Sequence, residues 1–108
     1  MRNEAVEIYS DQSNFAIMRH PGRHFPGSLI QGDSLTSLCH AADAVRREID
    51  RGDLEEAKAE LEMLRERLWY RLQNYEAVLV EHECELPFSR GLQPQPPLEV
   101  FDDEDEDA

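Results

Sequence analysis

The stretch Arg47–Ala57, REIDRGDLEEA, decides the fold, because it holds a stop signal for one helix and a start signal for the next. Gly52 is the residue type that most readily takes the left-handed conformation just after a helix. Asp53 is a favoured N-cap, and Glu55 and Glu56 place acids in the turn that follows. So short a connection predicts two antiparallel helices lying side by side.

Upstream of this turn, apolar residues recur every three or four positions, which is the period of an amphipathic helix. We expect the first helix to start at Asp33, with Asp33 or Ser34 as its N-cap, and to have about 18 residues. Its apolar stripe consists of Leu35, Leu38, Ala42, Val45 and Ile49.

Downstream, a longer helix of about 31 residues is expected before Pro87. The first helix ends opposite the region near Arg71, so the last turns of the second helix overhang it. The N-terminal segment is the candidate cover for this overhang, and a second copy of the chain is the alternative. The stripe of the second helix consists of Leu54, Ala57, Leu61, Leu64, Leu68, Leu72, Tyr75, Leu79 and His82.

The first 31 residues have the period of strands. Residues 4–9 (EAVEIY) place Val6 and Ile8 on one face, and residues 14–19 (NFAIMR) repeat the pattern with Phe15 and Ile17 inward. The polar SDQS between them favours a turn, and residues 28–31 are expected to form a third strand. The predicted fold class is α+β: a small N-terminal antiparallel sheet of two or three strands packs on a long antiparallel two-helix hairpin.

We assign residues 1–86 to this single domain and residues 87–108 to a tail. The tail holds four prolines and ends in six consecutive acids, residues 102–107. Such a composition buries little apolar surface, so a flexible, disordered tail is expected.

The net charge of the chain restricts the classes of partner that it is expected to bind. The chain has 11 Lys and Arg against 24 Asp and Glu, a formal net charge of −13. Direct nucleic-acid binding is therefore not expected, and a protein partner with a basic surface is favoured. No basic leader and no apolar run of about 20 residues is present, so we expect a cytoplasmic protein that does not bind membranes. Cys39 and Cys84 are too few for a disulfide framework and are expected to be reduced thiols.

The letters Gln31–Thr36, QGDSLT, match the motif that carries the nucleophilic serine of GDSL-type esterases. That chemistry also needs a base, an orienting carboxylate and oxyanion donors. The family's G-x-N-D and D-x-x-H blocks are both missing from the sequence. We therefore expect Ser34 to lie in the first turn of a helix, and we predict no catalytic residues and no enzyme activity.

The loop Arg19–His24 gathers Arg19, His20, Arg23 and His24 without a carboxylate. Guanidinium groups suit an anion, a phosphate or the acidic face of a partner. Alternatively, the arginines pair with glutamates of the chain's own helices. His20 and His24 have a separation known from metal sites, but the intervening Pro-Gly breaks the helix that would align them. No metal or other cofactor is expected.

Trp69 and Tyr70 are adjacent on the second helix, so one ring must point away from the helix seam. An outward ring there is a candidate anchor for a partner. Packing beneath the N-terminal sheet is the other explanation.

The block VEIYSDQSNFAIMRHPGRHFPGSLIQGDSLTSL, Val6–Leu38, resembles the opening of a family of short, stand-alone, uncharacterised bacterial proteins. The resemblance implies no known activity, and no functional residue is carried over.

Together these observations predict a non-enzymatic, acidic protein-interaction module. The most concrete form is a bacterial immunity or inhibitor protein that covers a basic site on a partner such as a toxin, and a homodimer is the other assembly considered. The alternative function is a small-molecule or anion-binding regulatory module that uses the loop of residues 19–24.

Overall fold

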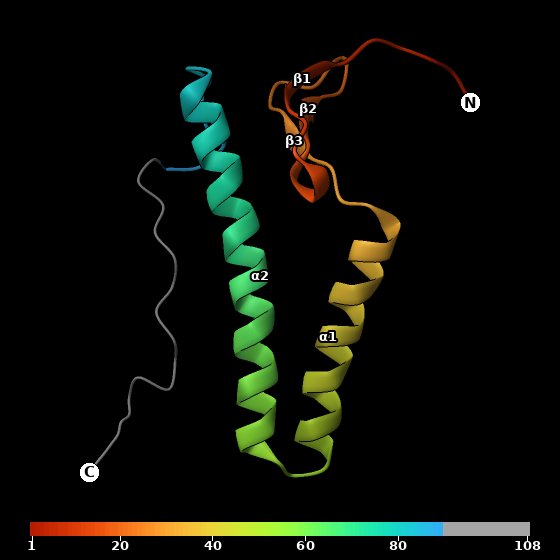
Figure 1. Cartoon of the computed structure of the whole chain (residues 1–108), viewed down its shortest axis with the longest axis vertical. Coiled ribbons are helices and arrows are strands. Elements are labelled where there is room, and N and C mark those ends of the chain that lie inside the picture. Colours follow the sequence, from red (N-terminus) through yellow and green to blue (C-terminus); the bar gives the residue numbers. More distant parts are fainter. Residues whose placement is uncertain (90–108) are drawn as a thin grey trace.

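The computed structural model describes residues 1–89 of the 108-residue chain. Three short strands and a 3-10 helix lie beside the C-terminal half of the longer of two antiparallel helices (Figure 1). The predicted α+β class is confirmed, and the predicted tail lies outside the described residues from residue 90 onward. The elements are β1 (Glu7–Ser10), η1 (Ser13–Phe15), β2 (Ile17–Arg19), β3 (Gly27–Ser28), α1 (Gly32–Asp50) and α2 (Leu54–Glu81).

The turn between α1 and α2 has the predicted chemistry. Gly52 has φ +79°, and its N–H donates to the carbonyl of Ile49 at 3.0 Å. The N–H of Asp53 donates to the carbonyl of Glu48 at 2.9 Å, which completes a Schellman motif. The Asp53 carboxylate then accepts the N–H of Glu56 at 3.1 Å and caps α2.

The start of α1 differs from the prediction that Asp33 or Ser34 is its cap. Gln31 is the N-cap, because its carbonyl accepts the N–H of Leu35 at 2.9 Å. The Gln31 side chain makes no capping hydrogen bond. The cap therefore lies two residues before Asp33, and α1 begins at Gly32. The Asp33 carboxylate instead accepts the N–H of its neighbour Ser34 at 2.8 Å.

The end of α2 comes slightly earlier than expected. Glu83 takes a left-handed conformation, with φ +56°, and the N–H of Cys84 donates to the carbonyl of Leu79 at 2.8 Å. This closes the helix at Glu81 in the same way that Gly52 closes α1. The chain then turns back, so that the segment up to Phe88 returns along α2.

The sheet has the strand order β1-β2-β3, and both pairs of strands are antiparallel. Ile8 lies opposite Met18, and a bulge then shifts the register so that Ser10 lies opposite Ile17. Ile17 is fully buried, whereas Ile8 is 57% exposed. Tyr9 faces α2, with its ring 5.3 Å from the ring of His82.

Two details of the strand prediction are therefore wrong. Val6 and Ile8 do not share the inward face of Ile17, because Tyr9 takes the side towards α2 and strand alternation then places Ile8 outward. Phe15 belongs to η1 rather than to a strand. In addition, β3 is only two residues long and starts one residue before the predicted strand.

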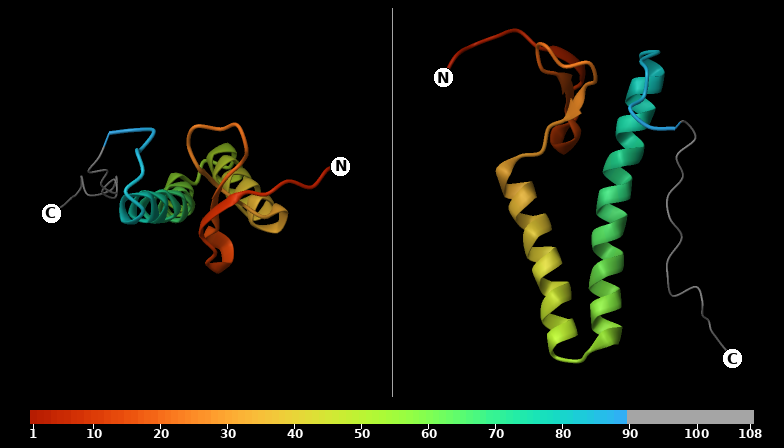
Figure 2. Two further views of the ribbon diagram at one scale, coloured as in Figure 1. Left: turned by 90° about the horizontal axis from the view of Figure 1, so that it is seen from above. Right: turned by 180° about the vertical axis from the view of Figure 1, so that it is seen from behind.

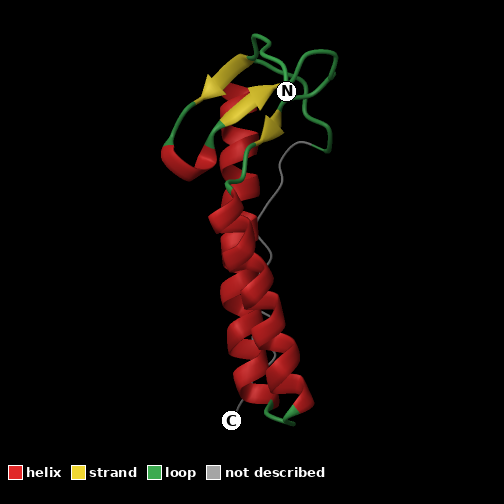
Figure 3. Cartoon of the chain, turned by 90° about the vertical axis from the view of Figure 1, so that its right-hand side faces the viewer, coloured by secondary structure: helices red, strands yellow, loops and turns green. Residues whose placement is uncertain are grey.

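The core lies between the sheet and the C-terminal half of α2 (Figure 3). It consists of Ile17 from β2 with Tyr75, Val78 and Leu79 from α2. The buried hydroxyl of Tyr75 donates to the carbonyl of Pro26 at 2.6 Å and ties the loop before β3 to the helix. The N-terminal sheet therefore covers the overhang of α2, as predicted.

The first residues of the predicted tail take part in this packing. Phe88 lies against the core, with its ring centroid 6.2 Å from that of Tyr75, and Leu86 packs on the same cluster. The packed part of the chain thus reaches two residues beyond the domain boundary predicted at residue 86.

The two helices lie closest at the turn and separate towards the sheet (Figures 1 and 2). As a result, α1 contains no buried residue, although it carries a full apolar stripe. The expected closed seam between the helices is formed only in part.

Candidate functional site

The four residues of the loop at 19–24 have different surroundings. Arg19, at the end of β2, donates its Nε to Glu7 Oε1 at 2.6 Å and its Nη1 to the carbonyl of Arg23 at 3.0 Å. The Arg19 guanidinium lowers the pKa of Glu7 from 4.5 to about 2, with a further contribution from the Tyr9 hydroxyl. In return, the Glu7 carboxylate raises the pKa of Arg19. Arg19 thus has an internal partner.

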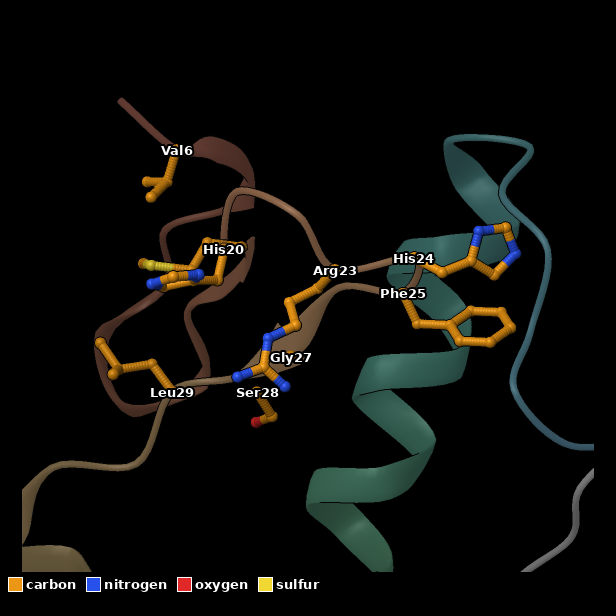
Figure 4. Close-up of a pocket in the computed structure, with 9 residues that line it drawn as sticks. Val6, His20, Arg23, His24, Phe25, Gly27, Ser28 and Leu29 are labelled. Atoms are coloured by element: carbon orange, nitrogen blue, oxygen red, sulfur yellow. The ribbon is translucent and has the colours of Figure 1, made fainter. Parts of the chain in front are cut away.

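His24 also finds a partner within the chain. Its Nε2 lies 3.3 Å from Glu85 Oε1, and its ring meets that of Phe25 edge-on at 4.4 Å. Figure 4 shows both rings directed towards the end of α2. Arg19 and His24 are therefore each paired with a glutamate of the same chain. These glutamates do not lie within a helix, because Glu7 is in β1 and Glu85 follows α2.

Arg23 and His20 have no carboxylate partner among residues 1–89. Among residues 1–89, no carboxylate lies within ion-pair distance of the exposed Arg23 guanidinium. His20 Nδ1 lies 3.0 Å from the carbonyl of Pro21; because a carbonyl only accepts, this nitrogen carries the proton.

Both side chains line an open groove of about 610 Å³ at the sheet end of the molecule (Figure 4). The sequence drew attention to the charged residues of this groove but not to its apolar ones, because their convergence depends on the sheet register. The complete lining is Val6, Met18, His20, Arg23, His24, Phe25, Gly27, Ser28 and Leu29.

Of the adjacent aromatic residues, Tyr70 is the outward ring. It is 64% exposed and meets the ring of Phe15 edge-on at 5.4 Å, while Trp69 is half-buried. The Arg71 guanidinium lies over the Phe15 ring, 5.0 Å from its centre. Tyr70 therefore covers η1, and neither aromatic residue lines the groove beside Arg23.

Ser34 lies in the first turn of α1, as expected. Its N–H is bonded to the Asp33 carboxylate, and the small groove of about 190 Å³ that it lines contains no histidine.

Because the seam between α1 and α2 is only partly closed, some apolar side chains of both helices are exposed. The sequence did not single out this surface. In α1, which packs on α2, Leu38 and Val45 are half-buried. Leu35 and Ile49, which precede and follow them on the same stripe, are 49% and 52% exposed. One edge of the stripe is therefore packed and the other faces solvent.

The same division holds in α2. Ala57 is buried and Leu64 is half-buried, whereas Leu54 and Leu68 are 61% and 48% exposed. In both helices, a packed residue follows an exposed one by three positions, as Leu38 follows Leu35, or precedes it by four, as Leu64 precedes Leu68.

In both helices, the exposed edge is thus displaced from the packed edge in the same rotational sense about the helix axis. Because the helices run antiparallel, this common displacement brings both exposed edges to the same side of the hairpin. We call this surface the hairpin face. It consists of the exposed residues Leu35, Ala42, Ile49, Leu54 and Leu68, with the half-buried Leu61 between the last two.

The sequence also led to expectations about metal ligands, thiols and membrane-spanning helices, and the structure can be compared with each of them. Within residues 1–89, no group of three or more His, Cys, Asp or Glu side chains is arranged to hold a metal ion. Cys39 and Cys84 are both free thiols, with Cys39 exposed. Neither α1 nor α2 is long and apolar enough to cross a membrane.

Comparison with known proteins gives one match. No curated protein and no solved structure matches the chain significantly. The model of a family of unknown function, DUF6959, matches residues 1–88, which include the sheet, both helices and the segment that packs back on the core. The predicted resemblance over Val6–Leu38 thus extends over the whole described domain, and the chain belongs to the family of unknown function DUF6959.

Proposed function

We propose that the chain is a non-enzymatic protein-interaction module, acting in the cytoplasm, that binds a basic protein partner through the hairpin face. The observation that carries this proposal is that α1 has an apolar stripe but no buried residue. Its exposed edge lies on the same side of the hairpin as that of α2. A surface of this kind suits a partner that lays an apolar helix or ridge along it.

The expected gain from covering this face is substantial. Burying the exposed half of one Leu or Ile side chain contributes about 1 kcal/mol, roughly half the value for a fully buried side chain. Leu35, Ile49, Leu54 and Leu68 are each about half exposed or more. Several such contributions lie in one continuous strip, so a complementary partner gains them together.

The charge of the helices supports a basic partner. Residues 32–81 contain twelve Asp and Glu against seven Lys and Arg, whereas residues 1–31 contain three of each sign. The acidic excess thus lies in the helical hairpin rather than in the sheet, and it would steer a basic surface towards the hairpin. An inhibitor or immunity protein that covers the basic active site of a toxin is the most concrete form of this function.

The experiment compares substitutions on the two sides of the hairpin. Ile49→Lys places a cation on the hairpin face, and Met63→Lys is the matched control, since Met63 is 59% exposed. Met63 lies nine residues after Leu54, two and a half turns along the helix, and therefore on the opposite face of α2. Affinity capture from the native lysate, followed by reconstitution with the identified protein, should give a complex that survives Met63→Lys and is lost with Ile49→Lys.

Light scattering on the purified chain separates this proposal from self-association. We expect the mass of one chain in the absence of the partner. A dimer that Ile49→Lys dissociates would show that a second copy occupies the hairpin face and would contradict the proposal of a basic partner.

A further inference from the structure

We propose that the groove beside Arg23 binds a small monocarboxylate with an apolar body. This site lies at the sheet end of the molecule and shares no residue with the hairpin face, so it does not rest on the function proposed above.

Arg23 is held in position by its backbone. The loop turns at Gly22, which has φ +82°, and the N–H of Arg23 donates to the carbonyl of His20 at 3.1 Å. The carbonyl of Arg23 accepts Nη1 of Arg19, which the Glu7 carboxylate holds in turn. The backbone of Arg23 is therefore fixed at both its N–H and its carbonyl, while no residue of the described part of the chain accepts a hydrogen bond from its guanidinium.

The hydroxyl of Ser28 has a proton that it can donate. Ser28 Oγ accepts Nη1 of Arg71 at 3.1 Å, so its own proton remains available for donation. Ser28 and Arg23 line the same groove (Figure 4). Together they offer a planar cationic fork and a neutral donor, which match the two oxygens of a carboxylate.

Part of the groove lining is apolar. Val6, Met18 and Leu29 line the groove with the polar groups, and Val6 and Leu29 are 37% and 49% exposed. Figure 4 shows Val6, His20 and Leu29 along one side, with the Arg23 guanidinium facing them. A volume of about 610 Å³ lies within the range of small-molecule sites. The ligand therefore needs an apolar body as well as an anionic head.

The charge balance selects a monoanion. Arg23 is the one cation that lines the groove with no carboxylate partner among the described residues, and the chain as a whole carries −13. A phosphate dianion would bring a second charge that the groove does not neutralise, whereas a carboxylate is matched by one guanidinium.

The test uses octanoate on the full chain, with octanamide as its neutral counterpart, acetate as the head without the body, and octyl phosphate as the dianion. We expect octanoate to raise the melting temperature with increasing concentration and to shift the NMR signals of residues 18–29. Octanamide lacks the charge and should bind about tenfold more weakly, the difference that one charge-assisted contact contributes. Acetate, which lacks the apolar body, and octyl phosphate, which brings a second charge that the groove does not neutralise, should also bind about tenfold more weakly or worse.

Variants locate the site. Arg23→Gln should weaken octanoate binding about tenfold. Arg47→Gln is the control, because Arg47 is an exposed arginine of α1 that makes no ion pair within the described residues. Ile49→Lys should also leave octanoate affinity unchanged. The proposal is overturned if octanoate gives no shift at about 10 mM, if octanamide binds equally well, or if Arg23→Gln binds like the wild type. Loss of binding in Ile49→Lys would place octanoate on the hairpin face and would also overturn it.

Discussion

Glu7 is the residue whose ionisation the fold changes most clearly. Arg19 lowers its pKa to about 2 from 4.5, so the charged pair stabilises the folded state above pH 4.5, and this contribution is lost as the pH falls through about 2. We expect the Glu7 carboxyl signal to titrate near pH 2 in an NMR experiment and to move towards 4.5 in Arg19→Gln. Arg47→Gln should leave the midpoint in place. A wild-type midpoint near 4.5 would show that the pair does not form.

Tyr75 ties the loop before β3 to α2 by a single buried hydrogen bond. Tyr75→Phe leaves the carbonyl of Pro26 without this donor, so we expect a loss of about 1 to 2 kcal/mol in the free energy of unfolding, measured with urea. Tyr70→Phe is the control, since Tyr70 is 64% exposed and should change stability little. Equal losses in the two variants would contradict a specific role for the Tyr75 hydroxyl.

At this scale the sequence predicts residue types better than partners. It drew attention to Arg19, His20, Arg23 and His24 as a group, but only the sheet register brings Arg19 to Glu7 and only the reversal after α2 brings Glu85 to His24. Which cations stay unpaired depends on contacts between residues far apart in the chain. No local pattern contains that information.

The turn between α1 and α2 is the element that the sequence defines best, because both of its signals are local. Gly52→Ala forces an L side chain into φ +79° and should cost about 1 kcal/mol of stability. Gly32→Ala is the control: Gly32 is the first residue of α1 with open space around it, and alanine there should preserve or raise stability. Urea unfolding of both variants checks this difference, and equal effects would count against the Schellman turn.

Other elements were less predictable. Strand alternation correctly places Ile8 on the opposite face of β1 from Tyr9. It does not predict which of the two faces meets α2, and in the structure the ring of Tyr9 takes that side. The start of α1 also escaped prediction, since Asp33 is a good cap by type but the chain is already helical at Gly32. In the sheet, tertiary packing therefore decided what the local pattern left open.

On the scale of the whole molecule, the chain divides into two ends with different properties. The sheet covers the last turns of α2 and forms the core together with them. Near the turn between α1 and α2, Ala57 is the one buried residue among those described. The apolar period predicted both stripes, but not how far each helix would rotate about its axis or where the pair would separate. The hairpin face depends on those angles, so it required the structure.

The most direct test of this account is the affinity of the reconstituted partner for Ile49→Lys, Ile49→Glu and Met63→Lys, each compared with wild type. If a basic partner covers the hairpin face, Met63→Lys should bind like wild type and Ile49→Glu should be weakened about tenfold by loss of apolar contact. Ile49→Lys should be weakest of all, because it adds repulsion of like charge. Equal binding by Ile49→Lys and Met63→Lys would contradict the account, since the partner would then not contact the hairpin face.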